Sequence, residues 1–421
     1  MRRHDDATPR SGRAPAGRDL AIDATRGLAI WSMISLHFAN GMLIARPTHS
    51  FPLVDGMSAF VLLSGLILGL VYRGWIERQT LGYAYHRLAQ RLLVLYVAQV
   101  TISLAAVAVG LVLSGRDFRT ITNLPAGEPL VQQVWWALTL RFLPGGGSIL
   151  VVYLVLMTLA FAILPALARG AWAAVLAVSG ALYVYSQVAP AWWMYLNSSP
   201  DGGPVQNWLA WQVLFVPAMV LGWKWHDWQL PARLDASLGV LAATTVAVGA
   251  LLYTGLHGPR LLARAPELIG KVDLGPLRAL VAWLAVITVY AAFRQVQRRT
   301  RRDWLAPLAT VGARSLDAYV IQAVALLAIP VLVVFRPWGP GVSTLIVLAV
   351  FGACWGWARF RQRAGIDKLH RLPAEIARIR RRRVEGVPAQ EGTHDDTTRP
   401  HRSRQSRRGH PQRARRELVG R

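Results

Sequence analysis

The stretch DATRGLAIWSMISLH, residues 23–37, lies inside an apolar run that extends from about residue 20 to residue 43. A run of about 20 mainly apolar residues is long enough to cross a bilayer as a helix. Asp23, Arg26 and His37 interrupt this run with ionisable side chains. Because charge inside a membrane is costly, such residues are candidates for function. The stretch therefore predicts a membrane protein whose first helix carries part of the functional site.

Apolar runs of similar length recur along the whole chain. Ten of them predict transmembrane helices, near residues 20–43, 53–73, 88–113, 147–168, 171–190, 208–225, 236–256, 277–295, 315–335 and 341–358. They are too long and continuous for barrel strands, and only helices or closed barrels satisfy the backbone in lipid. The predicted fold class is all-α, a polytopic membrane helical bundle. The stretch 131–143 is too short to span, and Trp135 and Trp136 favour an interfacial or re-entrant piece there.

The composition excludes an ordinary soluble enzyme and a disordered protein. Hydrophobic residues make up 53% of the 421 residues and charged residues only 16%, whereas soluble proteins average about 25% charged. The net charge is +25, and residues 359–421 carry 19 basic and 7 acidic residues, or +12 of it. We expect a disordered basic lead at 1–18, a membrane domain at 19–360 and a mostly disordered basic tail at 361–421.

The distribution of basic residues predicts the orientation. Ten spans place both termini on one side, and putting that side in the cytoplasm gives 13 basic residues in inside loops and 9 in outside loops. The two tails, with 5 and 19 basic residues, favour cytoplasmic termini.

No cleavable signal peptide is evident, so the first run is expected to be a signal anchor in a bacterial inner or plasma membrane. The tail, with one possible amphipathic helix at 366–383, is expected to meet anionic lipid rather than nucleic acid.

The charged residues of the first helix share a face. Arg26 and His37 are eleven residues apart, which is within about 20° of three full turns and about 16 Å along the axis. Asp23 and Arg26 are three residues apart and are expected to meet. This face would connect a cytoplasmic anion site to a buried base. Each residue alone has another interpretation: a helix-dipole charge for Asp23, a snorkelling side chain for Arg26 and an interhelical hydrogen bond for His37.

The second run and the basic loop after it add further candidates. The run begins at Asp55 and contains the Ser64-Gly65 step, which lets a backbone or a thin ligand come close, although plain helix packing explains it equally well. The loop from Arg73 to Arg91 carries several cations suited to the phosphates of a nucleotide-bearing donor. Charge that only sets the topology is the alternative explanation for any single arginine there.

At these residues the chain resembles the OpgC group within the acyltransferase family 3 clan. The first helix has that clan's arginine, then ten residues from Gly27 to Leu36, then His37. Other landmarks follow in the same order over roughly residues 18–335. They are Asp55 with the segment 59–66, the segment 149–156 containing Tyr153, the segment 207–215 (NWLAWQVLF), the segment 273–278 (DLGPLR) and the segment 312–316 (GARSL).

The resemblance implies a ten-helix membrane O-acyltransferase. Its donor would be cytoplasmic acyl-CoA, with no further cofactor, and its acceptor a hydroxyl of an envelope glycan, polysaccharide or glycolipid, with succinylation of periplasmic glucans as the namesake activity. His37 would be the base or an acyl relay, Arg26 would hold the donor or carry negative charge, and Asp23 would fix Arg26. The matching positions Asp55, Ser64, Tyr153, Asn207, Trp211 and Gln212 would bind substrate, and Arg87 and Arg91 the donor phosphates.

The chain departs from the family pattern at three positions. Ser58 and Ser148 (or Gly147) stand where carboxylates are common, and Val281 stands where a histidine is common. Each difference removes a polar group that could contact substrate. The three differences therefore affect the expected identity of the donor (succinyl) and of the acceptor (glucan) more than the expected fold.

Two other classes of function remain open on the sequence. A transporter or flippase for an anionic or lipid-linked sugar would use the buried charges as a pathway, although no repeated halves are evident. A binding or scaffolding protein would act through the basic tail.

The ten histidines are scattered without metal-ligand spacing, and Cys354 is the single cysteine, so no internal disulfide forms.

Overall fold

The computed structural model describes residues 19–49, 51–112, 127–145, 147–257, 265–300, 303–332 and 338–365. By its internal contacts the chain divides into Met1–Gly365 and Ile366–Arg421, and all described residues belong to the first unit. The expected lead at 1–18 lies outside the described residues. So does nearly all of the expected tail, including the amphipathic helix at 366–383.

Each of the ten apolar runs contains a helix. These helices are α1 (Leu20–Ala39), α3 (Gly56–Arg78), α4 (Leu81–Val112), α7 (Ser148–Ala168), α8 (Trp172–Val188), α9 (Trp208–Trp223), α11 (Leu238–His257), α13 (Pro276–Arg299), α15 (Ser315–Leu332) and α16 (Pro340–Arg363). Within the described part of the chain, six are long and apolar enough to cross a membrane: α3, α4, α7, α11, α13 and α16. A seventh results if α14 (Ala306–Ala313) and α15, bent by 87°, count as one span. The predicted helical fold is confirmed, with six or seven helices that could cross a membrane, while ten crossings and the side of the termini stay predictions.

Short elements connect these helices. They are η1 (Leu43–Ala45), α2 (Arg46–His49), α6 (Leu130–Leu138), η2 (Trp192–Met194), β1 (Tyr195–Asn197), β2 (Pro204–Asn207), α10 (Leu230–Ala236) and α12 (Pro266–Ile269). The strands form an antiparallel hairpin in which Tyr195 lies opposite Asn207. Helix α6 has nine residues, in keeping with the predicted short piece. Its Trp135 is 55% exposed, whereas Trp136 is buried beside Phe142.

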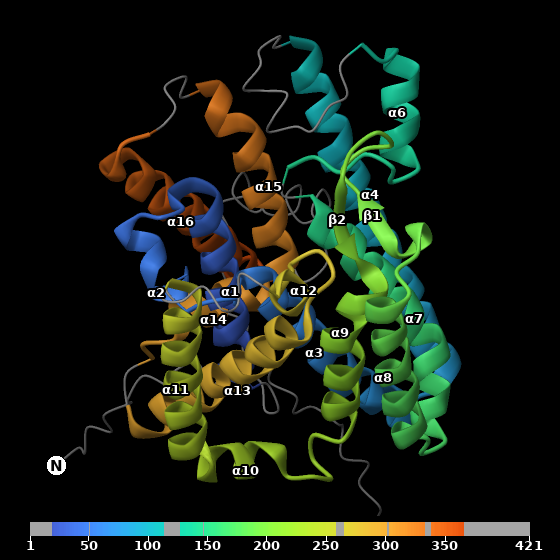
Figure 1. The fold of residues 1–421 in the computed structure, drawn as a ribbon, viewed down its shortest axis with the longest axis vertical. Coiled ribbons are helices and arrows are strands. Elements are labelled where there is room, and N and C mark those ends of the chain that lie inside the picture. The colour runs from blue at the N-terminus through green and yellow to red at the C-terminus, as the bar shows by residue number, and fades with distance from the viewer. Residues whose placement is uncertain are drawn as a thin grey trace, which may run out of the picture. The chain divides into compact units, whose positions relative to one another are not determined.

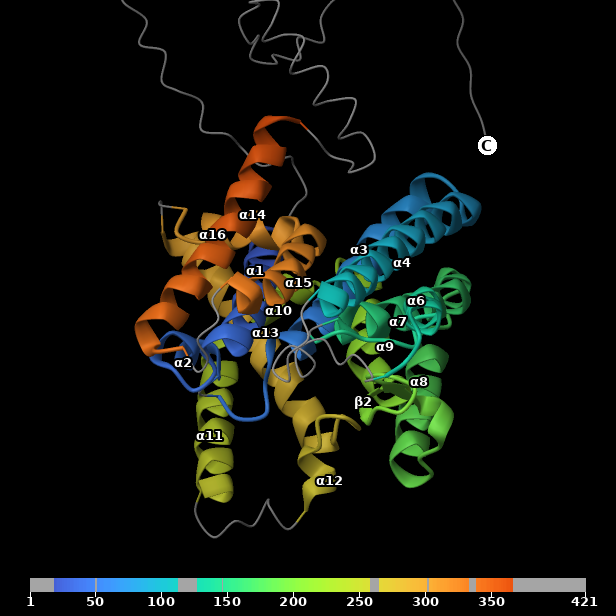
Figure 2. The same cartoon turned by 90° about the horizontal axis from the view of Figure 1, so that it is seen from above.

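Helices α1 and α3 lie at the centre of the described bundle. Helix α3 packs against α9 on one side and α1 on the other, and α9 is backed by α7 and α8. Helix α1 packs against α13, α14, α15 and α16. Helix α11 stands to one side and packs chiefly against α13 (Figures 1 and 2). The two central helices therefore separate two groups of helices, and the functional residues lie along them.

Glycines bring the central helices into backbone contact with their neighbours. A Cβ added at Gly65 or Gly222 would collide with a backbone carbonyl oxygen across the α3–α9 interface. The same holds for Gly27 and Gly312 across the α1–α14 interface. Small residues at such crossings are the usual way in which helices associate closely in membranes. The Ser64-Gly65 step therefore serves helix packing through its glycine.

A charged network holds the first turn of α1. The carboxylate of Asp19 accepts a hydrogen bond from the Ala21 amide (2.9 Å), which caps the helix. Arg294 of α13 lies 3.4 Å from Asp19 and 2.9 Å from Asp235 of α10. Hydrogen bonding from Arg294 lowers the pKa of Asp235, although burial opposes this shift. The beginning of α1 is thus tied to α13 and α10.

Candidate active site

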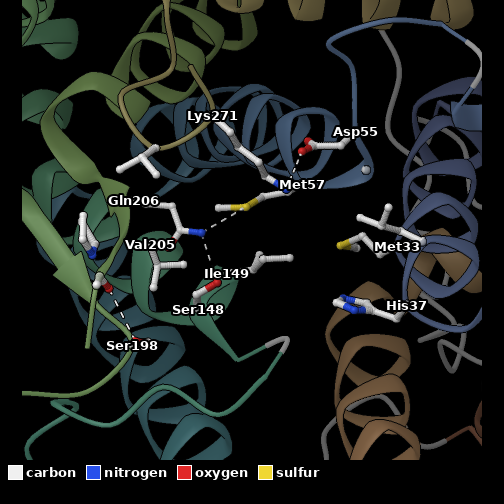
Figure 3. Close-up of a pocket in the computed structure, with 15 residues that line it drawn as sticks. Met33, His37, Asp55, Met57, Ser148, Ile149, Ser198, Val205, Gln206 and Lys271 are labelled. Atoms are coloured by element: carbon white, nitrogen blue, oxygen red, sulfur yellow. Dashed lines mark hydrogen bonds and ion pairs between the residues drawn. The ribbon is translucent and has the colours of Figure 1, made fainter. Parts of the chain in front are cut away.

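A cavity of about 450 Å³ lies between the last turn of α1, the first turns of α3 and α7, the β hairpin and the loop before α13 (Figure 3). We call it the histidine cavity. Its polar side chains are His37, Asp55, Ser148, Ser198, Gln206 and Lys271. Its apolar walls include Met33, Met57, Ile149 and Val205. A volume of this size is within the range that small-molecule sites occupy.

His37 projects from α1 into this cavity. Figure 3 shows its ring across the open space from Ser148 and Gln206. Within the described part of the chain, neither ring nitrogen has a hydrogen-bond partner. An imidazole nitrogen left available in a cavity that also holds polar side chains is suited to exchange a proton with a bound molecule.

Asp55 and Lys271 form an ion pair at one wall. Their Oδ2 and Nζ atoms are 3.0 Å apart. The other oxygen of Asp55 accepts hydrogen bonds from the amide (2.9 Å) and the hydroxyl (2.8 Å) of Ser58, which caps α3. Asp55 is therefore held from two sides, and Lys271, half exposed, presents a cation to the cavity.

Gln206 and Ser148 form a polar wall across the cavity from His37 (Figure 3). The Nε2 of Gln206 donates to the Oγ of Ser148 (3.1 Å). Gln206 is 3% exposed, and its Oε1 has no hydrogen-bond partner among the described residues. A buried polar atom without a partner costs free energy. These two residues can therefore bind hydroxyl groups of a ligand.

The loop that carries Lys271 is fastened by residues of the 207–215 landmark. The Asn207 amide (2.9 Å) and the Trp211 indole (3.1 Å) both donate to the Val272 carbonyl. The Asn207 side chain also donates to Asp273 (3.1 Å). Asn207 and Trp211, which were expected to bind substrate, do not line the histidine cavity. Their contacts make them positioning residues for Lys271.

Gln212 serves the packing of two helices. Its Oε1 accepts from the Ser179 hydroxyl (2.6 Å), and its Nε2 donates to the Ser179 carbonyl (2.8 Å). This reciprocal pair joins α9 to α8. Gln212 does not line the histidine cavity either.

A second, smaller cavity of about 40 Å³ lies nearer the beginning of α1, and we call it the arginine cavity. Arg26, Ser64 and Tyr153, three of the predicted site residues, line it together with Arg91, a fourth. The guanidinium of Arg91 lies 5.8 Å from the centre of the Tyr153 ring. The structure thus brings together residues of four different helices, which the sequence could predict only one by one as site residues.

The break between α14 and α15 supplies a partner for Arg26. Its Nη2 donates to the hydroxyl of Ser315, the first residue of α15. The close approach of Gly312 to the Asp23 carbonyl brings this break against α1. The 312–316 landmark therefore positions Arg26. Asp23 itself is buried at 6% exposure.

An aromatic contact lies between the two cavities. On α3, Met57 lines the histidine cavity and Ser64 the arginine cavity, and Phe60 lies on the same face between them. Phe60 is 2% exposed, and its ring meets that of Tyr153 edge-on at 5.9 Å. The two cavities are therefore separate spaces that share no lining residue.

Arg87 lies apart from the arginine cavity. Its guanidinium is 5.2 Å from the centre of the Trp75 ring, and its Nη1 donates to Gln90 (3.3 Å). Trp75 is also part of the cavity wall, so Arg87 lies behind that wall.

The sequence missed Lys271 and Gln206 as site residues. Lys271 counted only as one loop charge among several, and Gln206 adjoins the Asn207 landmark without belonging to it. Ser148 appeared only as a departure from the family pattern, yet it lines the histidine cavity, and Ser58, another departure, supports Asp55. Among the described residues, no group of three or more His, Cys, Asp or Glu is arranged to hold a metal.

A family model described as "OpgC protein" matches residues 18–365. Neither a curated protein nor a solved structure matches the chain. The family match covers all of the helices named above and both cavities.

Proposed function

The chain belongs to the OpgC family, and from this membership and the two cavities we propose that it is a membrane O-acyltransferase. It transfers an acyl group from cytoplasmic acyl-CoA to a hydroxyl of an envelope glycan or glycolipid. Its location is the bacterial inner or plasma membrane, where the basic tail meets anionic lipid.

The arginine cavity belongs to the donor. Arg26 and Arg91 line it, and guanidinium groups bind phosphate and thioester oxygens through charge-assisted hydrogen bonds. The phosphates of CoA stay at the cytoplasmic face near Arg87, since charge enters the membrane at high cost. The thin pantetheine arm passes Phe60 and Tyr153 and brings the thioester toward His37.

The histidine cavity belongs to the acceptor. His37 removes the proton of a sugar hydroxyl as its oxygen attacks the thioester carbonyl. The new C–O bond forms, the C–S bond breaks, and the proton on His37 passes to the departing thiolate, so the step is balanced. Gln206, Ser148 and Lys271 hold the other hydroxyls of the sugar. Positioning of this kind lowers the barrier by removing the entropy cost of orientation.

One observation carries the proposal: a histidine without a hydrogen-bond partner among the described residues faces a cavity with polar walls. A histidine that only packs helices together would have its ring nitrogens engaged by neighbouring side chains or carbonyls. Here the ring is left available for a substrate.

The test replaces His37 with alanine. Loss of a general base lowers the rate about 10²- to 10⁴-fold, so acyl transfer from acyl-CoA to a glucan acceptor should fall by that factor in purified membranes. His226→Ala is the matched control, because His226 is exposed and lies outside both cavities. Equal activity of His37→Ala and wild type, at equal protein level, overturns the role of His37.

The same assay in detergent separates transfer from transport. Acyl transfer needs no sealed compartment, so the purified protein should form the ester in micelles. A protein that moves its substrate only across sealed vesicles, without forming an ester, is a transporter instead.

A further inference from the structure

Two hydroxyl groups in the arginine cavity are buried without a hydrogen-bond partner. Ser64 is 3% exposed and Tyr72 is 2% exposed, and both line this cavity from α3. No atom of the described part of the chain forms a hydrogen bond with the Ser64 Oγ or the Tyr72 Oη. A buried polar group in this state costs free energy. The two hydroxyls therefore indicate a ligand that completes their hydrogen bonds when it is bound.

Ser64 differs from threonines in neighbouring helices. A serine or threonine inside a helix can donate to the carbonyl one turn earlier. Four threonines do so at 2.7–3.0 Å, namely Thr25, Thr101, Thr158 and Thr245. Ser64 does not make this bond, so its hydroxyl is left available on the side of the cavity.

Tyr72 differs in the same way from other tyrosines of the bundle. A buried tyrosine usually has a hydrogen-bond partner for its hydroxyl. The phenols of Tyr85, Tyr96 and Tyr183 each donate to a backbone carbonyl of another segment, at 2.7–2.8 Å. The ring of Tyr72 packs against that of Trp75, with 4.7 Å between the centres, and its hydroxyl is left unpaired among the described residues.

The two cations of the arginine cavity already have neighbours in the protein. Arg26 donates to Ser315, and the guanidinium of Arg91 lies 5.8 Å from the centre of the Tyr153 ring. What the protein leaves for a ligand is therefore chiefly the two hydroxyls, each of which can donate and accept a hydrogen bond. A secondary amide offers an acceptor and a donor together, whereas an anion offers acceptors only. The hydroxyl pair therefore favours an amide.

The volume and place of the arginine cavity agree with an amide. The cavity holds about 40 Å³, and one water-sized group needs about 10–15 Å³ of such space. Roughly three such groups fit, which matches the carbon, oxygen and nitrogen atoms of one amide and excludes a nucleotide. Tyr72 adjoins Arg73, which pairs with Asp227 at the end of the bundle that the proposed function gives to the donor.

From these observations we propose that Tyr72 and Ser64 hydrogen-bond an amide of the pantetheine arm of acyl-CoA. One hydroxyl donates to the amide oxygen, and the other accepts from the amide N–H. The pantetheine arm carries two secondary amides, and an amide that enters a membrane bundle needs partners there. The proposal rests on the proposed function for the identity of the donor. Within that function, Tyr72 selects thioesters that have an amide-bearing arm.

The test removes a single oxygen atom with Tyr72→Phe. Acyl-transfer kinetics are measured on the full-length protein in nanodiscs with two donors of the same acyl group. Acyl-pantetheine has both amides, and the thioester of ethanethiol has none. We expect the KM for acyl-pantetheine to rise about 2- to 10-fold, while the KM for the ethanethiol thioester stays unchanged. Ser64→Ala should change the two constants in the same directions.

Binding and stability give readouts that need no transfer. Free pantetheine, followed by equilibrium dialysis, should bind Tyr72→Phe more weakly by the same factor. The Tm of ligand-free Tyr72→Phe should not fall, because the phenol has no partner to lose; a lower Tm would contradict this premise. Tyr85→Phe is the matched control, since it loses a hydrogen bond to the Phe161 carbonyl (2.7 Å) outside the cavity. Its Tm should fall while its choice between the two donors stays that of wild type.

Three further results overturn the proposal: an equal rise in KM for both donors, unchanged binding of pantetheine to Tyr72→Phe, or displacement of bound pantetheine by inorganic phosphate, which would make the cavity an anion site. Failure of the proposed function looks different. In that case pantetheine still binds wild type more tightly than Tyr72→Phe, but no ester forms on any acceptor.

Discussion

Lys271 is the lysine that lines the histidine cavity and gives it positive charge. It pairs with Asp55 at 3.0 Å, and Asp55 keeps two hydrogen bonds from Ser58 whether or not the lysine is present. Removing the ammonium therefore takes a donor from the cavity without leaving the carboxylate wholly unsupported. This separates the effect on the ligand from the effect on folding.

We expect Lys271→Met to weaken acceptor binding. A hydrogen bond from a charged donor contributes about 1.5–3 kcal/mol, so KM for the glycan should rise about 10- to 100-fold with a smaller change in kcat. Steady-state acyl-transfer kinetics measure both constants. Lys224→Met is the control, since Lys224 pairs with Asp227 (3.1 Å) outside the cavity. A fall in kcat at constant KM would contradict a binding role for Lys271.

Several polar residues that were predicted to bind substrate do not line the histidine cavity, and their hydrogen bonds hold the protein framework. Asn207, Trp211 and Gln212 are nearly fully buried, and each uses its polar atoms on a loop or on a neighbouring helix. From the sequence they are indistinguishable from ligand-binding residues, because any polar side chain within a membrane bundle needs a partner. Most of their partners, such as Asp273, Val272 and Ser179, belong to segments more than 30 residues away, which no local pattern reveals.

The residues on α1 were easier to predict. A single helix has a fixed period, so the spacing of Arg26 and His37 already places them on one face. The structure has each of them lining a cavity. Phe60, which lies between the cavities on α3, could not be predicted in the same way, because its place depends on how α3 packs against α1.

At the scale of whole elements, the distance between two packed helices determines whether a glycine can be replaced by a larger residue. The contact of α3 with α9 is made through backbone atoms at Gly65 and Gly222, whereas Gly356 on α16 has nothing within 4 Å of an added Cβ. Two glycines in apolar helices therefore have opposite structural roles, although the sequence around them looks alike.

We expect Gly222→Ala and Gly356→Ala to shift stability in opposite directions. The Cβ of Gly222→Ala meets the Leu66 carbonyl oxygen and forces α9 from α3, at a cost of about 1–3 kcal/mol. Gly356→Ala meets no such contact and favours the helix by about 0.5–1 kcal/mol. Thermal unfolding in detergent, followed by circular dichroism, measures both. An unchanged Tm for Gly222→Ala would show that the α3–α9 contact is looser than the structure has it.

Helix positions are the part of the fold that the sequence predicts best. All ten apolar runs contain helices because about 20 apolar residues in lipid have no other stable conformation. The bend of 87° between α14 and α15 was not predicted. It occurs at Arg314, where the predicted span at 315–335 begins; Gly312 and Ser315 interrupt the apolar sequence there but do not reveal an angle, and the bend is what brings Ser315 to Arg26.

At the scale of the whole molecule, the two ends of the bundle carry different groups of residues. The ion pair between Arg73 and Asp227 (2.8 Å) places the last turns of α3 and the loop after α9 at one end of the bundle. The β hairpin, whose Ser198 and Gly203 line the histidine cavity, lies at the end that the proposed function assigns to the acceptor. The proposed reaction requires acyl-CoA at the first end and the glycan at the second.

Cysteine labelling in intact cells can decide the orientation, since the chain has a single cysteine, Cys354, that is 1% exposed. Wild type should therefore stay almost unlabelled by a membrane-impermeant maleimide. We expect Asp201→Cys, at the exposed turn of the hairpin, to be labelled from outside, and Gln79→Cys, exposed after α3, only after permeabilisation. The reverse pattern would put the arginine cavity on the outside, where no acyl-CoA is available. In that case the donor, rather than the position of His37, is the part of the mechanism that fails.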